Sequence, residues 1–284
     1  MANIIDSLSL PFGRYALIVA ILIAFTASLV GTPLVLKRYS FAGFGLSNVA
    51  FMATALAVII GINQELYIVM PLTVAASIII LRFGGQTKIR GDAALAMISI
   101  AAIAIGYFLL NTFISQEVIS SQLGSWLFGT NDILELTQID VWVAAGTTIV
   151  VLALFLFLYN KIFAVTFDSN FLQANGQKAK IYELVIATIV GIVVALSMQL
   201  VGALLTSALI IFPSLSAMRV AKNYKRATII AAIIAVGCAI LGILVSFAMD
   251  APSGVMIIIV NIVTFIVFFF AGMIFKRRLA GSSD

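Results

Sequence analysis

The sequence predicts an all-α membrane protein, a polytopic transmembrane bundle of about nine helices. Hydrophobic residues make up 63% of its 284 residues and charged residues only 10%, whereas soluble domains carry about 25% charged residues. A chain this apolar cannot cover a water-facing surface, so most of its surface has to face lipid. The apolar residues also gather in runs of about 20, the length of one membrane-spanning helix. We therefore expect one transmembrane domain over residues 1–284 and exclude a soluble enzyme.

Nine apolar runs follow one another with short connectors: 15–36, 41–62, 66–81, 93–114, 139–159, 181–198, 201–218, 227–249 and 254–275. Each run has to be helical in hydrocarbon, because only a helix satisfies its own backbone hydrogen bonds there. The first run is a span and not a signal peptide, because Asp6 precedes it and it is longer than a usual signal core. The sixth and seventh runs are short and lie close together around Gln199, so eight or ten spans are also compatible with the sequence.

Basic residues predict the orientation. With the N-terminus outside and the C-terminus in the cytoplasm, 15 of the 16 Lys and Arg residues fall on the inner side, and only Arg14 falls outside. Inner loops are typically rich in Lys and Arg, so we expect this orientation and an odd number of crossings. The net charge of +5 then reflects topology and does not indicate nucleic-acid binding. Seven acidic residues fall on the outer side: Asp6, Glu65, Glu117, Asp132, Glu135, Asp140 and Asp250.

Two connectors are longer than a turn. The outer one, 115–138, has no basic residue and is moderately apolar, so it either lies on the outer surface or dips back into the protein. The inner one, 160–180, carries Asp168 among aromatic residues and ends in Asn175-Gly176, a turn or helix-stop signal. This pattern predicts a short amphipathic helix over about 166–174, with Asp168 favoured near its N-terminus.

The sequence contains no catalytic constellation. It has no histidine, and its one cysteine, Cys238, lies in an apolar run. A disulfide framework, a cysteine metal cluster and a nucleophile–histidine pair are thereby excluded, and no Walker A pattern is present. We expect neither an enzyme active site nor a resident metal, so the energy for active transport has to come from another subunit or from an ion gradient.

Four stretches carry a resemblance to a known family. They are 36–43, Leu-Lys-Arg-Tyr-Ser-Phe-Ala-Gly, leading into Leu46-Ser47-Asn48; Gly91-Asp92, which opens the fourth run; Thr166-Phe167-Asp168, followed by Asn175-Gly176; and 199–205, Gln-Leu-Val-Gly-Ala-Leu-Leu, leading to Pro213. In their order and spacing they resemble the membrane permease subunits of bacterial ATP-binding-cassette importers of the zinc and manganese type. The resemblance runs from about residue 15 to residue 278.

The resemblance implies partners as well as a function. It implies a permease in the bacterial plasma membrane that pairs with a second copy of itself, with cytoplasmic ATP-binding-cassette ATPase subunits and with an extracellular solute-binding protein. The partner subunit would use the ATP, and this chain would hold no cofactor. The inner connector 160–180 is then a candidate ATPase-docking segment, with a solvated loop as the alternative. The expected docking residues are Phe167, Asp168, Leu172 and Gly176.

The chain differs from this family at the two positions of the second span that could bind a metal ion. In the resembling permeases an Asp and a His, four residues apart on the second span, face the central path, and this spacing puts both on one helix face. Here the matching positions are Phe44 and Asn48. The cargo is then a loosely held divalent metal ion, a metal complex or a small non-metal solute. The residues expected to line the translocation path, with no metal ligand among them, are Phe44, Ser47, Asn48, Thr206 and Ser207.

A secondary transporter driven by an ion gradient is a second interpretation, and an intramembrane enzyme or a structural membrane protein is a third, for which no paired nucleophile and base is evident. Secondary transporters usually place a functional acid or base inside the membrane. Here the carboxylates map to loops or to the ends of the runs, and no internal repeat is evident. The pattern therefore favours an ATP-driven importer.

Overall fold

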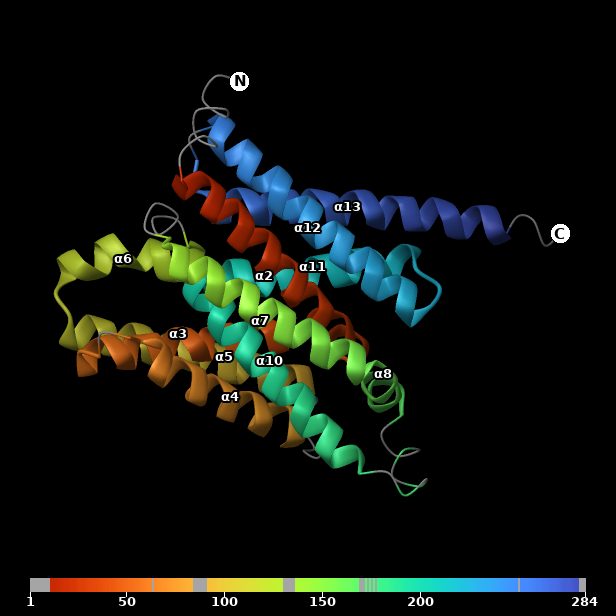
Figure 1. Ribbon diagram of the computed structural model, residues 1–284, viewed down its shortest axis with the longest axis horizontal. Helices are drawn as coiled ribbons and strands as arrows, with labels where there is room; N and C mark the ends of the chain where they lie inside the picture. The colour runs from red at the N-terminus through yellow and green to blue at the C-terminus, as the bar shows by residue number, and fades with distance from the viewer. Residues whose placement is uncertain are drawn as a thin grey trace.

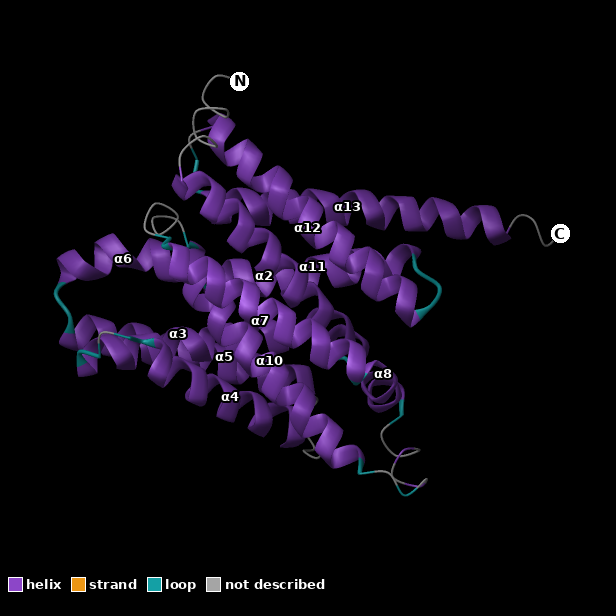
Figure 2. Ribbon diagram, viewed as in Figure 1, coloured by secondary structure: helices purple, strands orange, loops and turns teal. Residues whose placement is uncertain are grey.

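The computed structural model describes residues 11–62, 64–83, 91–129, 136–168, 172, 174, 176, 178–249 and 251–280. The regular structure of these residues is helical throughout (Figure 2). The helices are α2 (Pro11–Leu36), α3 (Ala42–Ile60), α4 (Leu66–Phe83), α5 (Gly91–Phe113), α6 (Gln116–Phe128), α7 (Gln138–Phe157), α8 (Tyr159–Phe167), α10 (Ala179–Val201), α11 (Ala203–Val220), α12 (Tyr224–Met249) and α13 (Ser253–Ala280).

The predicted fold class is confirmed. Eight described helices are long and apolar enough to cross a membrane, and a shorter apolar helix, Leu66–Leu81 within α4, accounts for the ninth predicted run. Each predicted run coincides with one of these helices within a few residues. Two short helices, α6 and α8, lie in the two long connectors.

The sixth and seventh runs form two separate helices, and the break lies at Gly202 rather than around Gln199. Gly202 has φ +85° and ψ +162°, a backbone region that is essentially restricted to glycine. Gln199 and Leu200 therefore continue α10, and a single residue separates α10 from α11. Since the two helices diverge from this point (Figure 1), other helices can pack between them.

The centre of the bundle is formed by α2 and α3. α2 packs against α7, α10, α11 and α12, and α3 packs against α4, α5, α10 and α11. In the apolar part of α2 78% of the residues are buried, whereas in α13 only 17% are. Large apolar side chains on the outer helices, such as Ile100, Ile149 and Phe270, are exposed. In a membrane protein such a face contacts lipid or another subunit.

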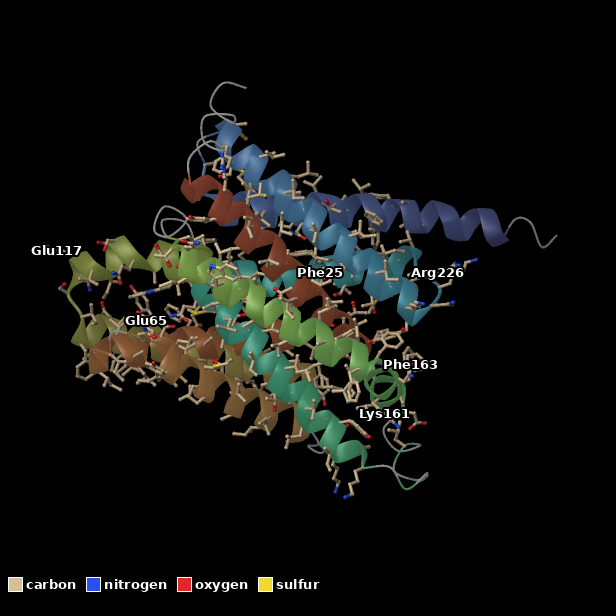
Figure 3. The ribbon with its side chains drawn as sticks, viewed as in Figure 1. Phe25, Glu65, Glu117, Lys161, Phe163 and Arg226 are labelled. Atoms are coloured by element: carbon tan, nitrogen blue, oxygen red, sulfur yellow. The ribbon has the colours of Figure 1, made fainter. Side chains whose placement is uncertain are left out.

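Charged residues separate to the two ends of the bundle (Figure 3). Glu65 and Glu117 lie at the end where α6 is found, and Lys161 of α8 and Arg226 of α12 lie at the opposite end. We call these the acidic end and the basic end. This separation of charges matches the charge pattern of the connectors. Every spanning helix has one terminus at the acidic end and the other at the basic end (Figure 1).

Candidate functional site

The predicted path residues on the second span lie in a tightly packed helix. α3 is held between α5 and α11, because Gly43 and Gly45 leave room for their neighbours. A Cβ atom on Gly43 would lie 3.1 Å from the Ile210 side chain of α11, and one on Gly45 would lie 3.3 Å from the Leu95 carbonyl oxygen of α5. α3 is thus positioned by close contacts on both sides.

Asn48 faces α5 and joins it through a hydrogen bond. Its Nδ2 donates to Ser99 Oγ over 2.6 Å, and both residues are buried. Its Oδ1 is buried and has no hydrogen-bond partner among the described residues. The amide therefore serves as a contact between two helices, and one carbonyl oxygen is left over in an apolar setting.

The other path residues bond to their own helices. Ser47 Oγ donates to the Gly43 carbonyl over 2.7 Å. Thr206 and Ser207, in the first turn of α11, donate to the carbonyls of Gly202 and Ala203 over 2.8 Å each. These three side chains are buried, and Phe44 is half-buried. Because α3 packs directly against α11, the two groups of path residues come from neighbouring helices.

The chemistry of these side chains is neutral. Among the described residues no three His, Cys, Asp or Glu side chains lie together in a way that could hold a metal ion. A dehydrated divalent cation in this setting would be an uncompensated buried charge, which costs many kcal/mol. The arrangement can therefore offer a cargo hydroxyl and amide groups but no anionic ligand.

The outer connector contains α6, which turns back to the bundle and ends against the α10–α11 break. Ile119 and Ser125 are buried, while Glu117, Ser120 and Ser121 are exposed. The ring of Trp126 meets that of Phe51 of α3 at 6.5 Å, edge to face. Part of the connector, 130–135, lies outside the described residues. α6 combines the buried contacts of a re-entrant piece with the polar exposed face of a surface helix.

Three backbone segments meet without side chains where α6 ends. A Cβ atom on Gly202 would lie 2.6 Å from the Gly129 nitrogen, and one on Gly129 would lie 2.5 Å from the Val201 carbonyl oxygen. Gly254, at the start of α13, abuts the Phe128 carbonyl in the same way. We call Gly129, Gly202 and Gly254 the glycine junction. It closes the bundle at the acidic end, directly next to Thr206 and Ser207.

The inner connector begins with a helix that the sequence pattern did not predict. α8 follows α7 after a bend at Leu158 and packs against the start of α12. The rings of Phe163 and Phe167 lie 5.4 and 6.2 Å from that of Tyr224. Phe163 and Phe167 are also 42% and 58% exposed. α8 therefore presents aromatic surface at the basic end, beyond the spanning helices. Burial raises the pKa of the Tyr159 hydroxyl at its start.

The expected docking residues fall into two groups. Phe167, Asp168 and Gly176 are exposed, while Leu172 is buried in a cluster with Val165 and Ala179. Leu172 therefore fixes the segment to the bundle from within.

The helix expected over 166–174 is divided differently. α8 ends at Phe167, and the Leu172 amide then donates to the Asp168 carbonyl over 3.4 Å. Leu172 and Ala174 have helical backbones. Gly176 follows with φ +70°, as expected for a helix stop. Residues 169–171, 173, 175 and 177 lie outside the described residues.

One ion pair between distant helices was also missed. Lys37, after the last turn of α2, lies 3.2 Å from Glu183 of α10. The sequence pattern indicates only a role in topology for Lys37. Glu183, however, is an acidic residue near the start of an apolar run at the basic end. That placement is the signal that could have identified the pair.

Comparisons with known proteins match almost the whole bundle. The model of the family described as the ABC 3 transport family matches residues 9–272. The chain is 29% identical over 261 residues to the manganese import system permease protein ScaB of Streptococcus gordonii, covering 91% of each chain. It is 24% identical over 273 residues to the manganese transport system membrane protein MntC of Listeria monocytogenes, covering 94% of each.

A solved structure shows the same fold. It is that of PsaBC from Streptococcus pneumoniae in complex with Fab, with a TM-score of 0.80 and 25% identity. The similarity covers 94% of this chain and 95% of that one. It therefore extends over the full arrangement of helices and is not limited to one motif.

Proposed function

The chain belongs to the ABC 3 transport family, whose model matches residues 9–272, and from this premise we propose that it is the permease subunit of a binding-protein-dependent, ATP-driven metal importer. The observation that carries the proposal is the match of the whole bundle to manganese import permeases. The chain is a multi-pass membrane protein, and the manganese permeases of Streptococcus gordonii and Listeria monocytogenes that it resembles are bacterial, which supports the bacterial plasma membrane as its location.

The cargo we propose is a divalent metal ion or a metal complex. Similarity to permeases named for manganese import supports a metal. Phe44 and Asn48 argue against a tight site for a bare ion, because neither side chain supplies an anionic ligand. A chelated metal or a small neutral solute, which would not need such ligands, is the second candidate. In either case the solute-binding protein, and not this chain, provides the affinity.

The partners follow from the two ends of the bundle. We place the basic end in the cytoplasm, since inner loops are rich in Lys and Arg. The ATPase subunit then docks on residues 159–176, which we call the docking segment, through exposed Phe167, Asp168 and Gly176. The solute-binding protein docks at the acidic end, and a second copy of the chain completes the permease. ATP is bound and hydrolysed by the ATPase subunit, and this chain needs no cofactor.

An uptake experiment tests the proposed function. The chain is expressed with its candidate ATPase and binding protein in bacteria that lack their own manganese importer, and cellular metal content is measured by mass spectrometry. We expect manganese to accumulate only when all three proteins are present and the ATPase is active. Unchanged manganese, zinc and iron content with all three proteins present would contradict a metal cargo.

A further inference from the structure

α10 connects the two ends of the bundle. It runs from the docking segment at the basic end to the glycine junction at the acidic end (Figure 1). Its 23 residues span about 34 Å at 1.5 Å per residue. α10 has no proline, whereas α2, α4 and α11 each contain one in their interior. α10 therefore lacks the residue that most often kinks a helix.

The basic end of α10 is packed directly against the docking segment. Val165 and Leu172 are buried against Ala179 in the first turn of α10, and Ile186 closes the same cluster. In addition, Lys161 Nζ lies 5.7 Å from the ring centre of Tyr182. A displacement of the docking segment therefore reaches α10 through side-chain contacts as well as through the chain between them.

The middle of α10 is held against α4. Ser77 Oγ donates to the Ala187 carbonyl over 2.7 Å. A Cβ atom on Gly191 would lie 2.7 Å from Val74 Cα, so the two backbones touch there. These contacts hold the middle of α10 against α4.

The acidic end of α10 stops at Gly202, the single residue that separates α10 from α11. Gly202 packs on Gly129 at the end of α6, and its carbonyl accepts the Thr206 hydroxyl. A shift of this end moves the glycine junction and the first turn of α11 together.

One ion pair ties the basic end of α10 to the central helix. Lys37 and Glu183 lie 3.2 Å apart, with side chains only 21% and 25% exposed. They line a recess between α2, α4, α8 and α10, together with Tyr39, Leu81 and Thr166. The pair is thus positioned where docking-segment movement would enter α10, and it fixes that end relative to α2.

We propose that Lys37 and Glu183 are the positioning pair for transmission along α10, because they hold its basic end, next to the docking segment, against the end of α2. The inference rests on the proposed function, because it requires an ATPase subunit on the docking segment. The pair does not touch the cargo. It keeps ATP hydrolysis coupled to opening at the opposite end of the bundle.

Charge reversal and charge exchange test the pair. The permease–ATPase complex is reconstituted in vesicles with its binding protein, and manganese uptake and ATP hydrolysis are measured in the same preparation. We expect Lys37→Glu and Glu183→Lys each to lower uptake per ATP by about tenfold, within the range typical of coupling between distant sites. The exchanged double variant should recover most of that loss, because it restores opposite charges. Glu183→Gln, which avoids repulsion and folds more safely, should lower the ratio by a smaller factor.

Lys180→Glu is the matched control, since Lys180 is an exposed residue at the start of the same helix. It should leave uptake per ATP unchanged. The inference would be overturned if uptake per ATP were unchanged in both single variants and in Glu183→Gln. It would also be overturned if the double variant had no higher uptake per ATP than either single variant.

The amount of ATPase subunit that co-purifies with the chain is measured for every variant. It should remain at the wild-type level, and its loss in the single variants would assign the pair to docking and overturn transmission. A wild-type complex without ATP-driven uptake would instead contradict the proposed function itself.

Discussion

At the residue scale, Asn48 shows how few ligand atoms the buried part of α3 offers. Its amide bonds to Ser99 of α5, so this side chain is used for helix packing. The free Oδ1 is one neutral oxygen, and Phe44 one turn earlier offers none. The side chains therefore favour a cargo that arrives already coordinated or that is held only weakly.

Replacing Asn48 by alanine should lower stability without changing metal binding. Interhelical hydrogen bonds in membrane proteins contribute about 0.6 kcal/mol on average and up to about 1.7 kcal/mol, so a loss in this range is expected in unfolding experiments. Calorimetry on the purified chain should show no high-affinity zinc or manganese site in the wild type or the variant. Tight binding that disappears in Asn48→Ala would contradict this. Ser47→Ala, whose hydroxyl bonds within its own helix, is the control.

At the scale of the element, single glycines decide where helices end. The break between α10 and α11 depends on a backbone conformation at Gly202 that other residues rarely adopt, and on the absence of a side chain where α6 abuts it. Apolar periodicity carries no information about this. For that reason the sequence pattern predicted a break in the correct region but three residues too early, around Gln199.

Gly202→Ala should destabilise the bundle. Alanine in this backbone conformation costs about 1–3 kcal/mol of stability. The new Cβ would also lie 2.6 Å from the Gly129 nitrogen, which would force the end of α6 away. The midpoint of thermal unfolding in detergent should fall accordingly. Gly237→Ala in α12 meets open space and should leave the midpoint unchanged or raise it slightly. Equal midpoints for the two variants would show that the glycine junction is not tightly packed.

The docking segment supports a prediction on an exposed aromatic residue. Phe167→Ala should reduce ATPase recovery with the purified chain by more than about tenfold, because an aromatic anchor at an interface often contributes about 2 kcal/mol or more. Phe157→Ala is the matched control, since Phe157 is 88% exposed at the end of α7. Wild-type ATPase recovery with Phe167→Ala would place the docking surface elsewhere.

At the scale of the whole molecule, the features readable from sequence are those that repeat. Runs of about 20 apolar residues predicted the spanning helices, and the positions of Lys and Arg predicted the two differently charged ends. The sequence pattern did not predict α8, because its nine residues are too few for a clear periodic signal next to a longer apolar run. The Lys37–Glu183 pair joins residues 146 positions apart, so no local pattern can reveal it. The contact of Asn48 with α5 likewise depends on how two helices are rotated.

The direction of the bundle across the membrane can be tested with single cysteines. The one native cysteine, Cys238, is buried, so a new thiol on the surface can be read without removing it. Ser120 on α6 and Lys178 before α10 are exposed at the acidic and basic ends. Ser120→Cys should react with a membrane-impermeant maleimide in intact cells, whereas Lys178→Cys should react only after permeabilisation. The reverse pattern would invert the topology. It would also place the docking segment outside the cell, where no ATP-hydrolysing subunit could reach it, so this one measurement bears on the ATPase-docking assignment and on the transmission along α10.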